Sequence, residues 1–161
     1  MAHSREDPEK SRPMTRPLEG IPLPDLDVLR DYERGFWEGA AAHELRIQRC
    51  AECKVLRHPP TPMCPHCHSL RYDWTRTSGR GTVYSFVIAR TPVHPALREK
   101  EQTPYNICLI ELEDQSHLRV ISNVLNVPPE DIRVGMPVQV TFVLAADDPR
   151  VVLPLFVPAV S

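Results

Sequence analysis

Two pairs of cysteines are the residues in this 161-residue chain whose type and spacing most directly indicate chemistry. Each pair has the form C-x-x-C, and ten residues separate the pairs, which comprise Cys50, Cys53, Cys64 and Cys67. Two such knuckles at the tips of adjacent hairpins supply the four thiolates of a tetrahedral zinc site. The same ligand set binds iron in rubredoxin-like sites. The spacing therefore predicts a tetrathiolate metal site that holds zinc, with iron as the chemical alternative.

We expect this site to be structural rather than catalytic, because an ion with four thiolate ligands has no open position for water or substrate. In a segment this small, metal binding contributes folding free energy on the order of 10 kcal/mol. His58, His66 and His68 lie near the knuckles and offer alternative ligands. Since four thiols are already available, we expect these three histidines to face solvent.

The other reactive side chains do not form a recognisable catalytic motif. The fifth cysteine, Cys108, lies in the apolar run NICLI, where we expect it to be part of the core. Glu111, Glu113 and Asp114 form an acidic edge of the kind found at a solvated hairpin end. The sequence contains no G-x-S-x-G elbow, no HExxH and no glycine-rich phosphate loop. It therefore argues against an enzyme that acts on its own.

Composition places the chain among ordinary globular proteins, except that its 18 prolines are about twice the usual share. No apolar run approaches the ~20 residues of a membrane span, and the first residues lack the apolar core of a signal peptide. We therefore expect a cytoplasmic protein without a membrane segment. Thiols stay reduced in that compartment, which favours metal over disulfides for the paired cysteines.

The elements that must position these cysteines follow from the pattern along the chain. Residues 1–24 are rich in proline and poor in large apolar groups, which predicts a flexible arm, either a free tail or a segment that wraps a partner. Residues 25–43 predict a helix with Asp25 as its N-cap, although Gly35 weakens the pattern. An aromatic stripe on this helix packs either on its own domain or on another subunit; it comprises Leu29, Tyr32, Phe36, Trp37 and Ala40.

The remainder of the chain predicts strands. Residues 44–80 contain short strand patterns around the cysteines, as in a zinc ribbon. Residues 81–161 contain five longer alternating segments separated by turn signals, which predict a five-stranded OB-fold barrel. The five segments are 81–92, 106–113, 117–125, 136–145 and 151–158. The expected fold class is therefore mostly β: an N-terminal helix, a rubredoxin-like zinc ribbon and an OB barrel.

This order of elements resembles a bacterial and archaeal family of zinc-ribbon and OB-fold proteins associated with acyl-CoA metabolism. The resemblance covers about residues 25–160. The segments that carry it include FWEGAAAHELRIQRCAEC, PPTPMCPHCHS, YDWTRTSGRGTVYSFVIARTPVHP and RVISNVLNVPPEDIRVGMPVQVTF. The chain departs from the family where glycine commonly follows the second cysteine of each knuckle, since Lys54 and His68 stand there. We expect some backbone strain at these two positions, with all four ligands retained.

The resemblance implies a partner and a ligand. Such proteins are small accessory subunits of thiolases, or of thiolase-like lipid-transfer-protein aldolases of steroid side-chain degradation. In those assemblies the large subunit carries the catalytic groups, and the barrel helps form the acyl-CoA channel. This chain is accordingly expected to be a non-catalytic subunit of a hetero-oligomer, with the aldolase type favoured and two copies on a partner dimer.

Candidate CoA contacts lie in the long loop between the first two barrel strands, a common ligand site in OB barrels. Arg90 and Arg98, with Lys100, could face CoA phosphates, and His94 and Tyr105 could line a pantetheine groove. A second possible phosphate surface is the set of arginines in the ribbon segment, Arg46, Arg49, Arg57, Arg71, Arg76 and Arg80.

Two other functions share these modules. Zinc ribbons and OB barrels also bind nucleic acid, but a binder needs a basic groove with exposed aromatic residues. Residues 44–80 carry a net charge of +4, whereas residues 81–161 carry −3 and the sequence pI is about 6.4. The charge distribution therefore makes nucleic-acid binding the weaker alternative. A rubredoxin-type electron carrier has the same ligands but no need for a barrel and a helix.

Overall fold

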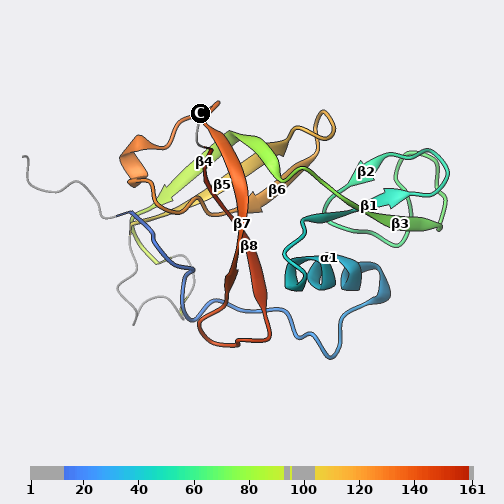
Figure 1. Ribbon diagram of the computed structural model, residues 1–161, viewed down its shortest axis with the longest axis horizontal. Helices are drawn as coiled ribbons and strands as arrows, with labels where there is room; N and C mark the ends of the chain where they lie inside the picture. Colours follow the sequence, from blue (N-terminus) through green and yellow to red (C-terminus); the bar gives the residue numbers. More distant parts are fainter. Residues whose placement is uncertain (1–12, 93–94, 96–103, 160–161) are drawn as a thin grey trace, which may run out of the picture.

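The computed structural model describes residues 13–92, 95 and 104–159. Within these ranges the chain forms one α-helix, a three-stranded sheet and a curled five-stranded sheet (Figure 1). The mostly β fold class is confirmed. In Figure 1 the small sheet lies at one end of the molecule, the five-stranded sheet at the other, and the helix beside both.

Helix α1 spans Asp31–Ala41 and is shorter than the predicted 25–43. Its N-cap is Arg30, whose backbone N–H donates to the Glu33 carboxylate at 3.1 Å. Asp25 was the wrong N-cap because its carboxylate caps a local turn instead, accepting the Asp27 N–H at 3.0 Å. A short carboxylate that bonds its own backbone two residues on competes with helix formation in this way.

The helix packs on its own chain, as one of the two expected arrangements predicts. Gly35 and Gly39 are buried, and a Cβ at residue 35 would lie 2.3 Å from the ring of Trp74. Gly35 therefore costs helix propensity but permits close approach to the ribbon sheet. On the neighbouring side of α1, Phe36 packs against the main core.

The ribbon sheet is antiparallel in the order β2-β1-β3. It consists of β1 (Arg46–Cys50), β2 (Leu56–Arg57) and β3 (Tyr72–Arg76). Strand β1 leads directly into the first cysteine knuckle, because Cys50 is its last residue. The Ala51 N–H donates to the Arg71 carbonyl at 3.0 Å, which fixes this knuckle to the start of β3.

The five-stranded sheet has the antiparallel order β6-β5-β4-β7-β8. Its strands are β4 (Arg80–Ala89), β5 (Tyr105–Leu112), β6 (Arg119–Ser122), β7 (Pro137–Leu144) and β8 (Val152–Pro158), with a 3-10 turn at Pro129–Asp131. A register shift between Val83 and Ser85 marks a bulge in β4, the kind of feature that bends a strand. A parallel bridge between Val124 and Phe156 joins the two edges of the curled sheet.

A buried asparagine secures that junction. Asn106 on β5 is 0% exposed; its amide nitrogen donates to the Val124 carbonyl at 2.8 Å, and its oxygen accepts the Val124 N–H at 2.7 Å. Both backbone groups of Val124 are thereby satisfied beside the closing bridge. This polar residue inside an otherwise apolar barrel therefore fixes how the sheet edges meet.

The ribbon and the barrel share one hydrophobic core. Leu45 and Ile47 from the ribbon side cluster with barrel residues such as Val83, Ile110 and Phe156. Gln115, in the β5–β6 turn, bonds both the N–H and the carbonyl of Leu56 on β2, at 2.8 and 2.9 Å. The zinc-ribbon segment is thus packed against the barrel rather than joined to it by a free linker.

The predicted arm is partly incorrect. Residues 1–12 lie outside the described part, but residues 13–24 pack along the barrel, with Met14 and Leu18 each 9% exposed in a second core cluster. The Gly20 N–H also donates to Asp147 at 2.6 Å. The few apolar side chains between the prolines therefore suffice to hold this segment, which composition alone did not reveal.

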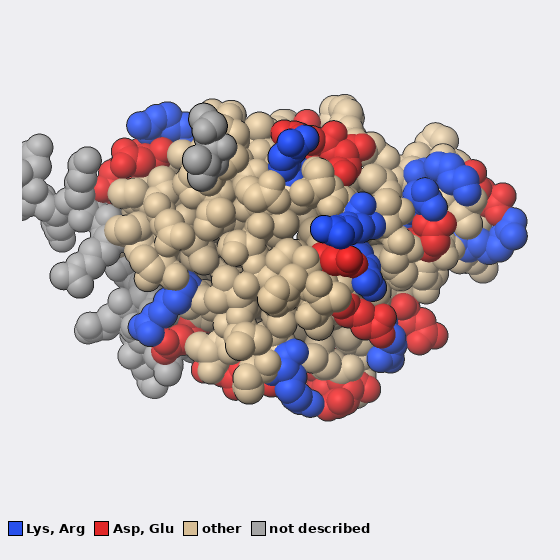
Figure 2. Space-filling view, in the orientation of Figure 1, with Lys and Arg blue, Asp and Glu red and all other residues tan. Residues whose placement is uncertain are grey.

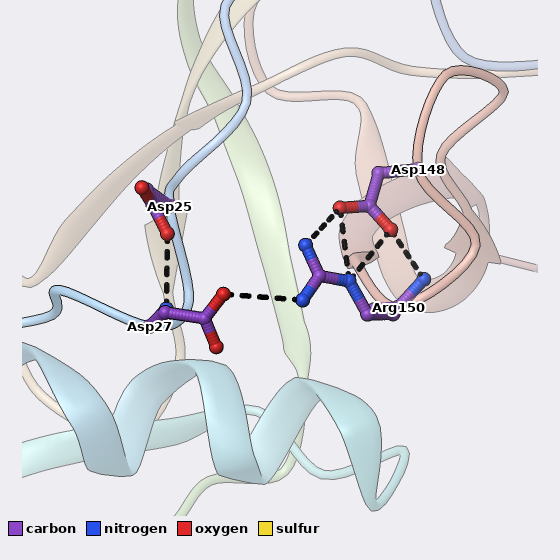
Figure 3. Close-up of polar contacts among 4 residues, drawn as sticks. All are labelled: Asp25, Asp27, Asp148 and Arg150. Carbon is purple, nitrogen blue, oxygen red and sulfur yellow. Dashed lines mark hydrogen bonds and ion pairs between the residues drawn. The ribbon is translucent and has the colours of Figure 1, made fainter.

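A polar contact holds the next part of the same segment. Arg150, in the β7–β8 hairpin, donates to Asp148 at 2.9 Å and to Asp27 at 3.3 Å (Figure 3). Asp25 in turn accepts from the backbone of Asp27. The turn before α1 is thereby connected to a hairpin more than one hundred residues later in the sequence. No helix in the described part of the chain has the length and apolar character needed to cross a membrane.

Candidate metal centre and apolar groove

The four cysteines of the two knuckles converge as predicted. The sulfur atoms of Cys50, Cys53, Cys64 and Cys67 all lie within 4.8 Å of one another. The Cys50–Cys67 and Cys53–Cys64 sulfur pairs are 3.5 and 3.7 Å apart. A tetrahedron with Zn–S bonds of ~2.3 Å has sulfur separations of ~3.8 Å, so the geometry fits a zinc ion.

The two knuckles have the same backbone pattern. The N–H of Lys54 donates to the Cys50 carbonyl at 3.1 Å, and the N–H of His68 donates to the Cys64 carbonyl at 2.9 Å. Lys54 and His68 have φ of 64° and 60°, in the left-handed region that favours glycine. The strain predicted at these two positions is therefore present in the backbone.

The surroundings of the sulfurs favour thiolates, but the thiolates repel one another. Burial raises the pKa of Cys50, but N–H donors from Cys53 and Glu52 outweigh it and lower the pKa to about 6. The Val55 N–H lowers the pKa of Cys53, whereas burial and the neighbouring sulfurs raise it to about 12. A divalent cation among the sulfurs removes this conflict, because it stabilises all four as thiolates.

Two of the three nearby histidines face solvent as expected, and the third does not. His66 and His68 are exposed. His58 is half-buried, its ring centroid lies 5.0 Å from that of Phe36, and burial lowers its pKa to about 4. The expectation for His58 was wrong because β2 directs the chain back toward α1 directly after Arg57.

The candidate CoA contacts occupy different environments. Arg90 directly follows β4 and is exposed. Tyr105 is the first residue of β5, is 1% exposed, and belongs to the second core cluster. His94 and Arg98, together with Lys100, lie outside the described residues.

Carboxylates accompany most arginines of the ribbon segment. Arg46 and Arg76 both reach Glu44, while Arg49 pairs with Asp73 at 2.8 Å and lowers the pKa of that carboxyl. Arg71 pairs with Glu52, and Arg80 with Glu113 at 2.9 Å. On the face seen in Figure 2, acidic and basic side chains lie next to each other over the ribbon and border an uncharged expanse over the barrel. This pairing weakens the second phosphate surface that the sequence suggested.

Arg57 has a different environment from the other five. It is 7% exposed, and it donates to the Thr61 carbonyl at 3.3 Å. Its cross-strand neighbour Gln48 is 0% exposed and accepts the Thr61 N–H at 2.9 Å. These two side chains therefore hold the chain between β2 and the second knuckle, and Arg57 is not available to a surface ligand.

Cys108 is buried, in agreement with its expected place in the core. Its sulfur donates to the Asn106 side-chain oxygen at 3.4 Å, and burial raises its pKa to about 11. A thiol with such a pKa stays protonated at neutral pH and is a poor nucleophile.

The described part of the chain also contains a large groove that the sequence did not predict. It has a volume of about 780 Å³ and lies between the residue 17–29 segment, α1, the Pro59–Pro60 segment and the barrel. Trp37, His58 and Tyr105 contribute to its wall. Its lining comes from stretches that are distant in sequence, at residues 17–37, 58–60, 105–107, 121–123 and 153–155, so no local pattern could indicate it.

Known family models match the two modules just described. Residues 37–73 match the description "ChsH2, rubredoxin-like zinc ribbon domain", and residues 74–143 match "ChsH2, C-terminal OB-fold domain". A solved chain described as "Ltp2-ChsH2(DUF35) aldolase" is 41% identical, with a TM-score of 0.72; the match covers 83% of this chain and 98% of that chain. The chain belongs to the ChsH2 (DUF35) family. The family resemblance drawn from the sequence is confirmed.

Two curated relatives are longer proteins. A "Probable enoyl-CoA hydratase alpha subunit" of Thermomonospora curvata is 43% identical over 80% of this chain. A "3-oxo-4,17-pregnadiene-20-carboxyl-CoA hydratase alpha subunit" of Mycobacterium tuberculosis is 40% identical over 67% of this chain. The chain spans only 38% and 32% of the lengths of these relatives. The similarity therefore concerns only about a third of each relative.

Proposed function

We propose that this chain is a non-catalytic accessory subunit that binds a thiolase-fold enzyme of acyl-CoA metabolism and helps form its acyl-CoA channel. The observation that carries the proposal is its 41% identity to a chain of the Ltp2-ChsH2(DUF35) aldolase, matched over 98% of that chain. An accessory chain of this kind needs a stable scaffold and a partner surface. The metal centre provides the stable scaffold. It is not a reaction site, because four thiolates leave no position for substrate.

The steroid-aldolase type of partner is favoured over the thiolase type. The solved relative is named as an aldolase, and the mycobacterial relative is named for a pregnadiene-carboxyl-CoA, which is a steroid acyl-CoA. By this proposal the reaction at the thioester belongs to the partner subunit. The present chain contributes structure and part of the channel wall.

CoA itself is proposed to approach the barrel near the end of β4. Arg90 is exposed there and offers a guanidinium to a phosphate. Tyr105, at the start of the paired strand β5, forms an adjoining apolar wall rather than a surface contact, since it is 1% exposed. His94 and Arg98 remain candidates from the sequence.

Co-expression with the Ltp2-type aldolase subunit tests the proposal. Size-exclusion chromatography should give a stable complex with one zinc per copy of this chain, and retro-aldol cleavage of an acyl-CoA should require both chains. Two copies on a partner dimer are expected from symmetry. A chain that stays monomeric beside that subunit, or that cleaves the acyl-CoA alone, would show that the proposed role is wrong.

A further inference from the structure

The apolar groove between α1 and the barrel has the volume of a recognition site. Its volume of about 780 Å³ falls in the range of ~300–1,000 Å³ typical of binding pockets. Its lining includes Leu29, Phe36 and Trp37 from the helix and the segment before it, and Tyr105, Ile121 and Leu153 from the barrel. Prolines from the N-terminal segment, the ribbon and β8 stiffen the walls, so the groove is formed before anything binds.

The charges of this groove exclude one class of occupant. Asp25 and Glu33 are the only charged side chains among its described lining residues, and no lysine or arginine lines it. Each of these carboxylates uses one oxygen to accept a backbone N–H, from Asp27 and Arg30 respectively. His58 adds no positive charge at neutral pH, since its pKa is about 4. The groove therefore repels the phosphates of CoA and attracts a cation.

The rim of the groove is apolar and exposed. Val28 and Ile121 line it although they are 72% and 73% exposed, an unfavourable position for large aliphatic side chains in water. Ile121 on β6 is the cross-strand partner of Leu109 on β5. Ile107, which also lines the groove, is the cross-strand partner of Val87 on β4, and Val87 is 62% exposed. The members of each pair share a face of the sheet, so the apolar surface continues from the groove across β6, β5 and β4.

We propose that this groove receives an apolar segment of the partner protein that carries a lysine or arginine. The apolar side chains of that segment fill the space between Trp37 and Ile121, and its basic group meets Asp25 and Glu33. A preformed apolar cleft with aromatic walls and a few charged side chains at its edge is a common form of an interface hot spot. This inference rests on the proposed function and assigns the place at which the partner docks.

Binding of the co-purified Ltp2-type aldolase subunit to three variants of the full chain provides the test. Ile121→Asp should weaken binding by about 30-fold or more, because it places a carboxylate at the apolar rim. Asp25→Asn keeps the turn-capping oxygen but loses the charge, so it should weaken binding about 3- to 10-fold and flatten its salt dependence. Val134→Asp is the matched control, because Val134 is 67% exposed but outside the groove, and its affinity should stay within about twofold of wild type.

The outcomes separate the inference from the function on which it rests. If the wild-type chain binds the aldolase subunit and all three variants bind equally well, the groove assignment is wrong and the accessory role stands. If the wild-type chain does not bind, both fail. If the chain alone dimerises and Ile121→Asp makes it monomeric, a second copy occupies the groove and the inference is overturned. Zinc content and thermal unfolding establish that each variant is folded, and Asp25→Asn gives an independent result should Ile121→Asp not fold.

Discussion

Gly35 of α1 faces the indole of Trp74 on β3 so closely that a methyl group at residue 35 would lie 2.3 Å from the ring. Trp74 is half-buried in the folded chain, and its indole ring lies against the backbone of the helix. The backbone of α1 is thus in direct contact with the ribbon sheet. This contact sets the distance between the helix and the metal-binding module.

Gly35→Ala should therefore destabilise the protein, although glycine to alanine ordinarily stabilises a helix interior by about 1 kcal/mol. The added methyl group must displace either the helix or the indole, which costs about 1 to 3 kcal/mol in a packed site. Urea unfolding measures the effect. Glu38→Ala, on the exposed side of the same helix, is the control and should change stability by less than about 0.5 kcal/mol.

His68→Gly should stabilise the protein by about 0.5 to 1 kcal/mol with zinc retained. The left-handed φ of 60° costs a histidine about 1 to 2 kcal/mol, and glycine removes this cost. The greater freedom of glycine in the unfolded chain offsets part of the gain in stability. Leu70→Gly is a suitable comparison, because Leu70 is exposed nearby without a left-handed φ and should lose stability. A decrease in the melting temperature of His68→Gly would contradict the assignment of strain.

Cys50→Ser or Cys64→Ser should release zinc, lower the soluble yield and prevent assembly with the partner. Loss of one thiolate weakens a site whose binding free energy contributes to folding. Metal analysis and size-exclusion chromatography measure these effects. Cys108→Ala removes a buried thiol that is not a ligand, so it should keep one zinc per chain. A serine variant that stays folded and assembled but loses turnover would show that the metal takes part in the reaction.

Acidification should reduce stability through His58. In the folded protein burial holds its pKa at about 4, against an ordinary value of about 6.5, so the unfolded chain binds a proton that the folded chain does not. The stabilisation is complete above pH ~6.5 and is lost as the pH falls toward 4. An NMR titration of the imidazole gives the pKa directly. In the His58→Phe variant the free energy of unfolding should depend less on pH over this interval. If it falls as steeply as in the wild type, acid release of zinc rather than His58 accounts for the loss of stability.

The apolar anchors rather than the ion pair should hold the N-terminal segment on the barrel. Leu18→Ala removes a side chain that is 9% exposed and should cost about 2 to 4 kcal/mol. Asp27→Asn removes the charge that Arg150 pairs with, but both partners are mostly exposed, so the cost should be below about 0.5 kcal/mol. Thermal unfolding at low and high salt compares them, and a larger loss for Asp27→Asn would show that the hairpin contact is the main anchor.

Local patterns predicted the elements that depend on local spacing. The C-x-x-C spacing and the five alternating segments correspond to the knuckles and the barrel strands of the structure. Four of the five residues of the aromatic stripe lie in α1, and Leu29 precedes the helix. The start of α1 was missed because Asp25 caps a turn as readily as a helix, and the sequence does not distinguish the two.

Features that depend on distant residues could not be predicted. Asn106 looks like a strand-end residue in the sequence, yet it is buried and closes the barrel through Val124. His58 looks like a spare ligand, yet Phe36 on α1 covers it. The groove combines stretches that are distant in the chain, and Met14 and Leu18 are core residues only because the barrel lies beneath them. Each of these depends on the tertiary fold rather than on neighbouring residues.

The contact between the N-terminal segment and the β7–β8 hairpin has a consequence for biosynthesis. Gly20 bonds Asp147 and Asp27 bonds Arg150, so the docking partners are separated by 127 and 123 positions in the order of translation. At ~5–20 residues per second, the segment waits on the order of ten seconds after it leaves the ribosome. The four cysteines lie within residues 50–67, so the ribbon can capture its metal during that interval. The N-terminal segment is therefore translated before the ribbon and the barrel but buried after them. A chaperone that binds the nascent chain would meet this segment.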